Sequence, residues 1–362
     1  MSLTRYALWL FILTLTGYLM IVGKNLLQPL VLAVVFWYLI DTLAEFYKRF
    51  RIGRFHLPRS VALTSAILSF GTLVWLLGTV IGRNVTAVIA AAPGYQERLE
   101  KVFLSAADRL GFTDAPTLSQ LFNRFDLGSV LSDIAGAAAS VAGIIGIVIV
   151  YVGFLFVEQI NANRKIELLF RDPVRSGRLK TIMAQVSQDI QIYLRIKIML
   201  GLVVALIGYV IMWGVGLHFA GFWAVLIFFF YFIPTIGSLL AILSPVLLTL
   251  VQFDSLTPFF IVAVTMGITQ ISMANIVEPA IMGRSLNLSP FVIILSLMVW
   301  GTIWGVIGMF LCVPIMVIVM IVLANFEATR PVAVLLSADG RIFATRPPLQ
   351  PDALEEKGPV RE

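Results

Sequence analysis

A glutamate lies at the end of a long apolar run, where a carboxylate is costly to bury. Glu278 directly follows the uncharged segment 268–277. An acidic side chain at the bilayer centre costs roughly 2.5 to 3.5 kcal/mol on insertion scales, so it is normally kept for a transport path, a proton site or an ion pair. The amides of Gln270 and Asn275 precede it, and Asn275 and Glu278 are three apart, on one face of a helix. This cluster predicts a site for a monovalent cation or a small polyhydroxylated molecule.

The charged residues near the apolar segments also have structural interpretations. Glu278 could pair with Arg284 without any part in transport. Arg195 and Lys197 precede an apolar segment and Glu158 ends another, and snorkelling at the cytoplasmic interface explains all three.

Two segments that contain proline and glycine interrupt apolar runs with the same spacing. Pro234 and Gly237 lie in IPTIGSLLAILSP, and Pro279 and Gly283 lie in EPAIMGRSLNLSP. A helix broken at membrane depth leaves backbone groups unpaired, which is tolerated only where they face protein or a water-filled cavity. Paired interruptions of this kind mark the binding sites of secondary transporters. We therefore predict that the two segments are non-helical, meet near mid-membrane and form, with Arg284, a substrate or ion site.

The sequence contains no motif for catalysis or for holding a cofactor. It lacks GxxxxGK[ST], HExxH and GxSxG, so neither nucleotide hydrolysis nor intramembrane hydrolysis is expected. Its one cysteine, Cys312, sits in an apolar run, and His56 and His218 are too isolated to form a metal site. We expect a protein that is not an enzyme, without a catalytic residue, metal or cofactor, whose transport runs downhill or on a gradient.

Composition places the chain in a membrane. Hydrophobic residues make up 59% of the 362 residues and charged residues 13%, which a water-soluble domain could not carry without large exposed apolar patches. About 20 apolar residues cross the hydrocarbon core. The fold class is therefore an all-α polytopic inner-membrane protein with about eight transmembrane helices, of which the sixth can be two half-helices that re-enter near Pro234 and Gly237. The candidate spans are 3–22, 26–40, 61–81, 141–157, 200–217, 222–251, 258–277 and 291–323.

Lysine and arginine counts predict the orientation. The connections 41–60 and 158–199 are rich in basic residues and are assigned to the cytoplasm, whereas 82–140 has balanced charge and is assigned to the outside. An even number of spans then puts both termini in the cytoplasm. The net charge of +6 belongs to these loops and indicates orientation and contact with membrane lipid, not with nucleic acid.

The same pattern divides the chain into five segments. The outer loop 82–140 contains two amphipathic helical stripes, and the cytoplasmic segment forms an interfacial helix with Ser176 as its predicted N-cap. The segments are an N-terminal hairpin with a basic loop (1–60), the third and fourth spans with the outer loop (61–157), the cytoplasmic interfacial helix (158–199), a transport core with broken helices (200–326) and a cytoplasmic tail (327–362).

The chain resembles the AI-2E family of bacterial membrane proteins, which is named for export of autoinducer-2 and is also called the PerM family. The matching residues are FIPTIG at 232–237, NIVEP at 275–279 with MGR at 282–284, LSP at 288–290 and GTIWGVIGMFLCVP at 301–314. The resemblance implies an eight-span homo-oligomeric transporter, with a pentameric ring as one candidate arrangement.

Three functional hypotheses follow. The first is a secondary exporter of a small polar molecule of the autoinducer-2 type, as in quorum sensing. The second is a sodium, or other monovalent cation, antiporter for protons that uses Glu278 as its exchanging carboxylate. The third is a membrane scaffold that transports nothing. Substrate flux into proteoliposomes under a proton gradient separates the three.

Overall fold

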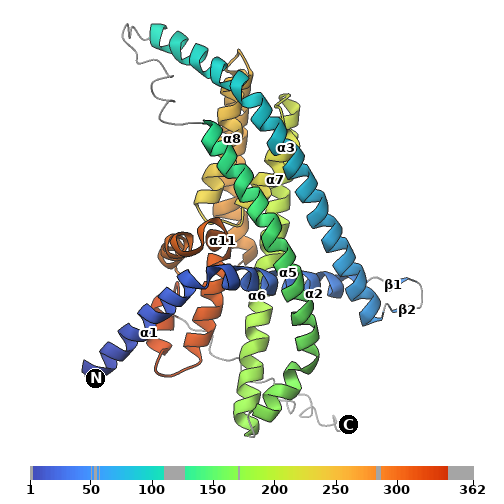
Figure 1. Cartoon of the computed structure of the whole chain (residues 1–362), viewed down its shortest axis with the longest axis vertical. Helices are drawn as coiled ribbons and strands as arrows, with labels where there is room; N and C mark the ends of the chain where they lie inside the picture. Colours follow the sequence, from blue (N-terminus) through green and yellow to red (C-terminus); the bar gives the residue numbers. More distant parts are fainter. Residues whose placement is uncertain are drawn as a thin grey trace, which may run out of the picture.

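The protein is an elongated bundle of helices (Figure 1). The computed structural model describes the backbone of residues 3–49, 51–52, 55–56, 58–109, 127–169, 172–282 and 287–340. Almost all of this backbone is helical, which confirms the predicted all-α class. The elements are α1 (Leu3–Val22), α2 (Lys24–Arg49), β1 (Arg51–Ile52), β2 (Phe55–His56), α3 (Arg59–Arg109), α5 (Leu127–Leu169), α6 (Pro173–Gly214), α7 (Ala220–Phe230), α8 (Ile236–Gln252), α9 (Thr257–Ser272), the π-helix η1 (Met273–Val277), α10 (Glu278–Met282), α11 (Pro290–Ala324) and α12 (Arg330–Leu336).

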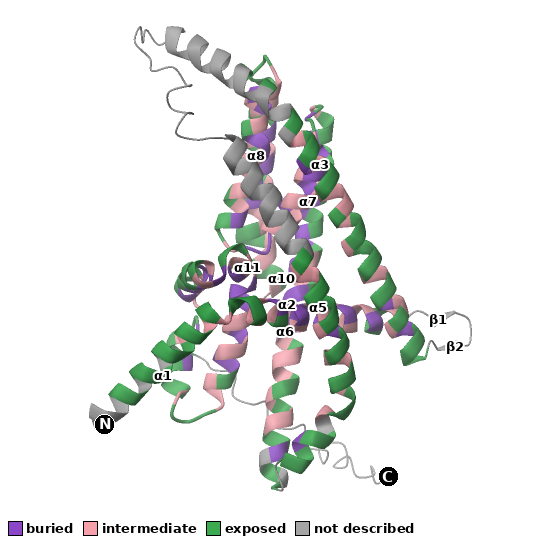
Figure 2. Cartoon of the chain, viewed as in Figure 1, coloured by how far each residue is buried: buried purple, intermediate pink, exposed green. Residues whose placement is uncertain are grey.

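The helices confirm a polytopic membrane protein. Within the described residues, six helices are long and apolar enough to cross a bilayer, and α1, α7 and α8 contribute shorter apolar helices. Much of the apolar surface is exposed, as Figure 2 shows along α1 and α3. In the apolar membrane-spanning stretches of α3 and α5, only 11% of the residues are buried. Side chains such as Trp75 and Phe154, 68% and 69% exposed, have lipid as their natural neighbour.

Long continuous helices carry the chain beyond the predicted spans. α3 has 51 residues and continues from the third span to Arg109, and α6 joins the predicted interfacial helix to the fifth span without a break. The N-cap of α6 is Asp172, which accepts a hydrogen bond from the backbone N–H of Val174, and Pro173 begins the helix. The prediction of Ser176 as N-cap was wrong, because proline at the first helical position extends the helix upstream.

The turn between α5 and α6 is tied by an ion pair at the protein surface. Lys180 Nζ lies 2.6 Å from Glu167 Oε1, and the lysine lowers the pKa of that carboxyl. Both side chains reach into solvent, so we expect little contribution to the free energy of unfolding.

The predicted sixth span is a helical hairpin. Tyr231–Thr235 separates α7 from α8, and the side chain of Gln252 at the end of α8 returns to the start of α7. Its Nε2 donates to the Gly216 carbonyl at 2.8 Å, and its Oε1 accepts from the His218 N–H at 2.7 Å. Both ends of the hairpin therefore lie together, and neither helix alone, at 11 and 17 residues, is as long as a full span.

A sharp bend at Gly305 divides the last predicted span. Gly305 has a φ of 65° inside α11, a conformation that favours glycine. Beyond the bend the chain passes so close to its first part that a Cβ on Gly308 would lie 2.0 Å from the Trp300 carbonyl oxygen. The spacing of Gly301, Gly305 and Gly308 in the sequence indicates close packing of helices. It does not predict a bend at Gly305.

The buried core lies where α2, α6, α11 and the α7–α8 hairpin meet. Tyr193 and Leu194 of α6 pack with Phe232 of the hairpin and Leu311 of α11 in one cluster. The rings of Phe232 and Phe310 stack with centroids 4.8 Å apart. The tip of the α7–α8 hairpin is thus held against α11 in the centre of the protein.

Candidate functional site

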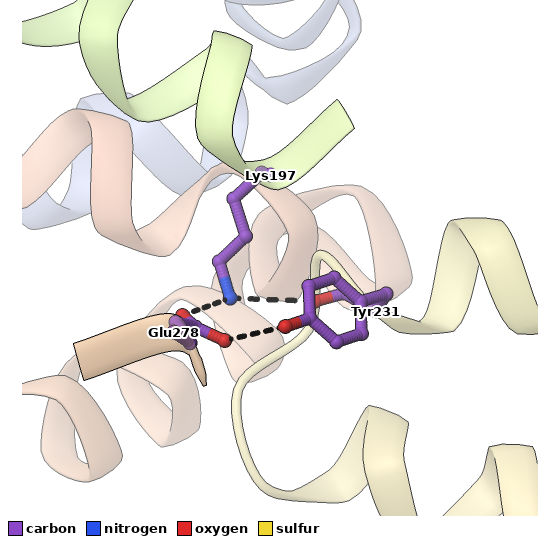
Figure 3. Close-up of polar contacts among 3 residues, drawn as sticks. All are labelled: Lys197, Tyr231 and Glu278. Carbon is purple, nitrogen blue, oxygen red and sulfur yellow. Dashed lines mark hydrogen bonds and ion pairs between the residues drawn. The ribbon is translucent and has the colours of Figure 1, made fainter. Parts of the chain in front are cut away.

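Glu278 lies in a polar cluster beside the tip of the α7–α8 hairpin (Figure 3). One carboxylate oxygen is 2.6 Å from Lys197 Nζ on α6, and the other accepts a hydrogen bond from Tyr231 Oη at 2.9 Å. Lys197 Nζ also donates to the Tyr231 carbonyl at 3.5 Å and lies 4.8 Å from the centre of its ring. We call these three residues the Lys197–Tyr231–Glu278 cluster.

The cluster is largely shielded from solvent. The side chains of Lys197 and Glu278 are 7% and 20% exposed. A buried charge is tolerated when it is paired and its remaining hydrogen-bonding capacity is used, and both oxygens of the carboxylate have a partner here. The cluster therefore links three separate parts of the chain: α6, the hairpin tip and the start of α10.

A π-helical turn precedes the carboxylate. In η1 the backbone N–H of Glu278 bonds to the Met273 carbonyl, five residues back instead of four. Pro279 follows directly within α10, where its ring would crowd the preceding turn of an α-helix. The wider turn accommodates the proline, and π-turns of this kind are frequent at functional sites.

The structure contains the first predicted break and places the second one later than predicted. The first is confirmed: the chain leaves the helix between Phe230 and Ile236, around Pro234, and a Cβ on Gly237 would lie 1.8 Å from the Phe230 carbonyl oxygen. In the second segment the break is not at Pro279, because the backbone stays helical from Thr257 through the π-turn to Met282; the described backbone is non-helical at 287–289, directly before α11. Gly283 lies outside the described residues.

The structure separates the predicted polar side chains. Asn275 is exposed and donates within its own helix, to the Ile271 carbonyl at 3.0 Å, whereas the Glu278 carboxylate contacts Lys197 and Tyr231. The π-turn between the two residues changes the angular spacing on which the i, i+3 argument depends. Gln270 is 2% exposed, and neither atom of its amide has a hydrogen-bond partner within the described structure. Arg284, the alternative partner, lies outside the described residues; among the described residues Glu278 pairs with Lys197.

Sequence reasoning missed Lys197 and Tyr231. The interpretation of Lys197 as a snorkelling residue was wrong, since it is buried and paired with Glu278. One signal was available: Lys197 continues the stripe of Ile190, Tyr193 and Leu194, so a charge falls on the apolar face of its helix. Nothing in the sequence around Tyr231 distinguishes it from its aromatic neighbours.

Removing the hydroxyl of Tyr231 should destabilise the protein. In Tyr231→Phe one carboxylate oxygen loses its donor, and a hydrogen bond to a charged group contributes about 1.5–3 kcal/mol. We expect a free energy of unfolding lower by about 2 kcal/mol, measured by thermal or chemical unfolding in detergent. Tyr209→Phe is the control, because Tyr209 is 39% exposed. Equal stability of the two variants would contradict the role of the hydroxyl.

Comparison with known proteins decides the family. A sequence profile described as AI-2E family transporter matches residues 8–328, nearly the whole chain. The chain belongs to the AI-2E transporter family. The AI-2E family membership confirms the resemblance drawn from the motifs, and it identifies a transporter rather than an enzyme.

Relatives of this AI-2E chain carry different functional names. A protein of Borreliella burgdorferi, named as a transport protein without a substrate, is 26% identical over 87% of this chain and 85% of its own length. The AI-2 transport protein TqsA of Escherichia coli is 25% identical over 87% of this chain and 90% of its own length. The sodium-lithium/proton antiporter of Halobacillus andaensis is 24% identical over 85% and 93%. This AI-2E chain is thus a transporter of the bacterial inner membrane with several spans.

Proposed function

We propose that this chain is a secondary transporter that exchanges a monovalent cation for a proton at the Lys197–Tyr231–Glu278 cluster. The buried ion pair at 2.6 Å carries the proposal. An ionisable pair inside a membrane protein is costly and is typical of ion and proton pathways. A relative of similar identity is named as a sodium-lithium/proton antiporter, which agrees with this chemistry.

The exchange follows from competition for one carboxylate. Both oxygens of Glu278 are occupied, one by the Lys197 ammonium and one by the Tyr231 hydroxyl. A dehydrated cation that binds Glu278 must displace the ammonium, and lysine can release a proton from a buried site whereas arginine cannot. The cluster is neutral with a charged lysine, and neutral again with a cation and an uncharged lysine. Exchange at this cluster is therefore one cation for one proton, without net charge movement.

The hairpin tip connects the exchange to a change of shape. Lys197 bonds to the backbone and Glu278 to the side chain of Tyr231, the first residue of the break. Displacement of the ammonium from this position removes one of the two hydrogen bonds to Tyr231, together with the contact between the ammonium and the Tyr231 ring. This arrangement supports opening of the hairpin tip when a cation replaces the lysine.

Proteoliposome flux tests this function. Purified protein is reconstituted, a proton gradient is imposed, and sodium or lithium movement is followed with the membrane potential clamped. We expect cation flux that depends on the proton gradient and is indifferent to the potential. Flux driven by the potential alone would contradict neutral exchange, and a folded protein that moves neither a cation nor autoinducer-2 would favour the scaffold hypothesis.

Export of a small polar molecule of the autoinducer-2 type is the second candidate. The buried amide of Gln270 favours it, because an unpaired donor and acceptor suit a hydroxyl or carbonyl of a substrate. The name of the TqsA relative points the same way. Export of the furanone from loaded proteoliposomes, with loss of export in Gln270→Leu and unchanged cation flux, would select this candidate.

We also propose that both termini lie in the cytoplasm, with the ends of the α7–α8 hairpin outside. The basic residues of 158–199 support a cytoplasmic position for that segment, and the reversal of α11 at Gly305 supports a return of the chain to the same side before its C-terminal end. Gln252 supports the second part, since its side chain joins both ends of the hairpin and its backbone carbonyl accepts a hydrogen bond from Arg98 of α3 at 2.7 Å. Arg98 belongs to the part of α3 that follows the third span.

Cysteine labelling checks this orientation. In a Cys312→Ala background, a cysteine at Lys165 should react only from the cytoplasm and one at Asp254 only from outside. If the segment 222–251 crossed once instead, Lys165 and Asp254 would label from the same side. Both positions are exposed, so a membrane-impermeant maleimide applied to intact cells and to inverted vesicles gives the result directly.

A further inference from the structure

A polar cavity lies between α2, α3 and α5, away from the Lys197–Tyr231–Glu278 cluster. Its volume is about 230 Å³, and its lining includes two acids, Asp41 and Glu45, and two bases, Lys48 and Arg59. Ligand pockets for drug-sized molecules occupy about 300–1,000 Å³. This cavity is therefore of a size for a small group that carries both signs of charge.

Hydrogen bonds and an ion pair hold the two acidic residues of the cavity in place. Trp37 Nε1 donates to Gln159 Oε1 at 3.3 Å, which leaves the amide nitrogen of Gln159 to donate to Asp41. Glu45 lies 3.7 Å from Arg195 of α6. The carboxylate of Asp41 is thus oriented by a neighbouring side chain that is itself fixed, as expected of a formed binding site.

The two basic residues of the cavity have hydrogen-bond donors available for a ligand. In the part of the chain that the structure describes, neither Lys48 nor Arg59 makes a hydrogen bond or a close ion pair, although both act on Asp41 electrostatically. Arginine and lysine together are a common arrangement for binding a phosphate. Two cations that line the cavity without a hydrogen bond or close ion pair among the described residues therefore favour an anionic group as ligand.

The position of the cavity indicates where that group comes from. The apolar part of α2 ends just before Asp41, that of α3 begins just after Arg59, and that of α5 ends near Gln159. The cavity thus lies where lipid headgroups meet the hydrocarbon core. Beyond it, α3 and α5 expose apolar side chains such as Leu68 and Phe154, which can contact acyl chains.

We propose that this cavity binds the headgroup of a phospholipid that carries a phosphate and a primary ammonium. The phosphate pairs with Lys48 and Arg59, and the ammonium donates to Asp41 and Glu45. Basic pockets between transmembrane helices on the cytoplasmic side bind lipid headgroups in this way. The soluble analogue O-phosphoethanolamine has the same charges without acyl chains, so it distinguishes a lipid from a cytoplasmic solute.

Native mass spectrometry of the delipidated protein, titrated with defined lipids, tests the proposal. Phosphatidylethanolamine should bind about tenfold more tightly than phosphatidylcholine, whose ammonium has no N–H to donate, and than phosphatidylglycerol, which has no ammonium. O-Phosphoethanolamine should bind more weakly than the lipid. Equal affinity for the two zwitterionic lipids, tightest binding of phosphatidylglycerol, or equal affinity for O-phosphoethanolamine would each overturn the assignment.

Variants connect the binding to this cavity. Asp41→Asn should remove the preference for phosphatidylethanolamine over phosphatidylcholine, and Lys48→Gln with Arg59→Gln should weaken binding of both about tenfold. Arg49→Gln is the matched control, since Arg49 is adjacent and exposed but does not line the cavity. Thermal unfolding without lipid shows that each variant is folded. Wild-type lipid affinity in the folded Lys48→Gln, Arg59→Gln variant would place the lipid elsewhere.

Discussion

Replacing Lys197 with arginine is expected to abolish cation/proton exchange while leaving the protein folded. Arginine keeps the positive charge beside Glu278, so the buried pair survives. The arginine side chain does not release its proton in proteins. An incoming cation therefore cannot replace it at Glu278, because the arginine cannot become neutral. Flux in proteoliposomes should fall to that of protein-free vesicles. Lys165→Arg, a surface lysine paired with Glu158, should retain wild-type flux.

Removing the charge of Glu278 separates transport from stability. Glu278→Gln should lose exchange and also lose about 3–5 kcal/mol of stability, because the Lys197 ammonium is then buried without its counter-ion. A Lys197→Gln, Glu278→Gln double variant should recover most of the stability but none of the transport. Wild-type exchange in Lys197→Arg or in Glu278→Gln would exclude the cluster from the mechanism. Furanone export that persists in both would favour the second candidate function.

Adding one methyl group at Gly237 should prevent formation of the hairpin tip. A Cβ there would lie 1.8 Å from the Phe230 carbonyl oxygen, and that backbone cannot move without disturbing Tyr231. We expect Gly237→Ala to lower the unfolding temperature by at least about 4 °C, or to prevent recovery of folded protein, because overpacking against backbone costs about 3 kcal/mol or more. Size-exclusion chromatography and thermal unfolding in detergent measure the effect.

Gly267→Ala is the matched control for this substitution. Gly267 lies within α9, and a Cβ there would have no atom within 4 Å. Alanine in a helix is favoured over glycine by roughly 0.5–1 kcal/mol, so this variant should be as stable as the wild type or slightly more so. If Gly237→Ala behaved like Gly267→Ala, the close approach at the hairpin tip would be wrong.

Much of the fold could be predicted from the sequence because the bilayer imposes strict requirements. Spans of about 20 apolar residues are visible in hydropathy alone, and proline with glycine at 234–237 marks a break that the structure contains. The bend at Gly305 could not be predicted, since glycines four apart equally favour close packing of straight helices. Only the positive φ distinguishes the two.

The candidate site could be predicted in part. Glu278 was identified because a carboxylate in an apolar run is costly, and that argument needs no structure. Its partners Lys197 and Tyr231 lie far away in sequence, on helices whose mutual approach a single sequence does not reveal. The spacing argument for Asn275 assumes a regular α-helix, whereas Asn275 lies within the π-turn that precedes the carboxylate.

The π-turn makes the position of Glu278 depend on the number of residues that precede it in the helix. Compared with an α-helical path, Met273–Val277 contains one additional residue, and each residue of an α-helix turns the chain by about 100°. Deleting one residue there would let the segment close as a regular helix and rotate Glu278 by about a quarter turn, away from Lys197. The meeting of carboxylate and ammonium therefore depends on a single-residue insertion, which no substitution at Glu278 or Lys197 could reproduce.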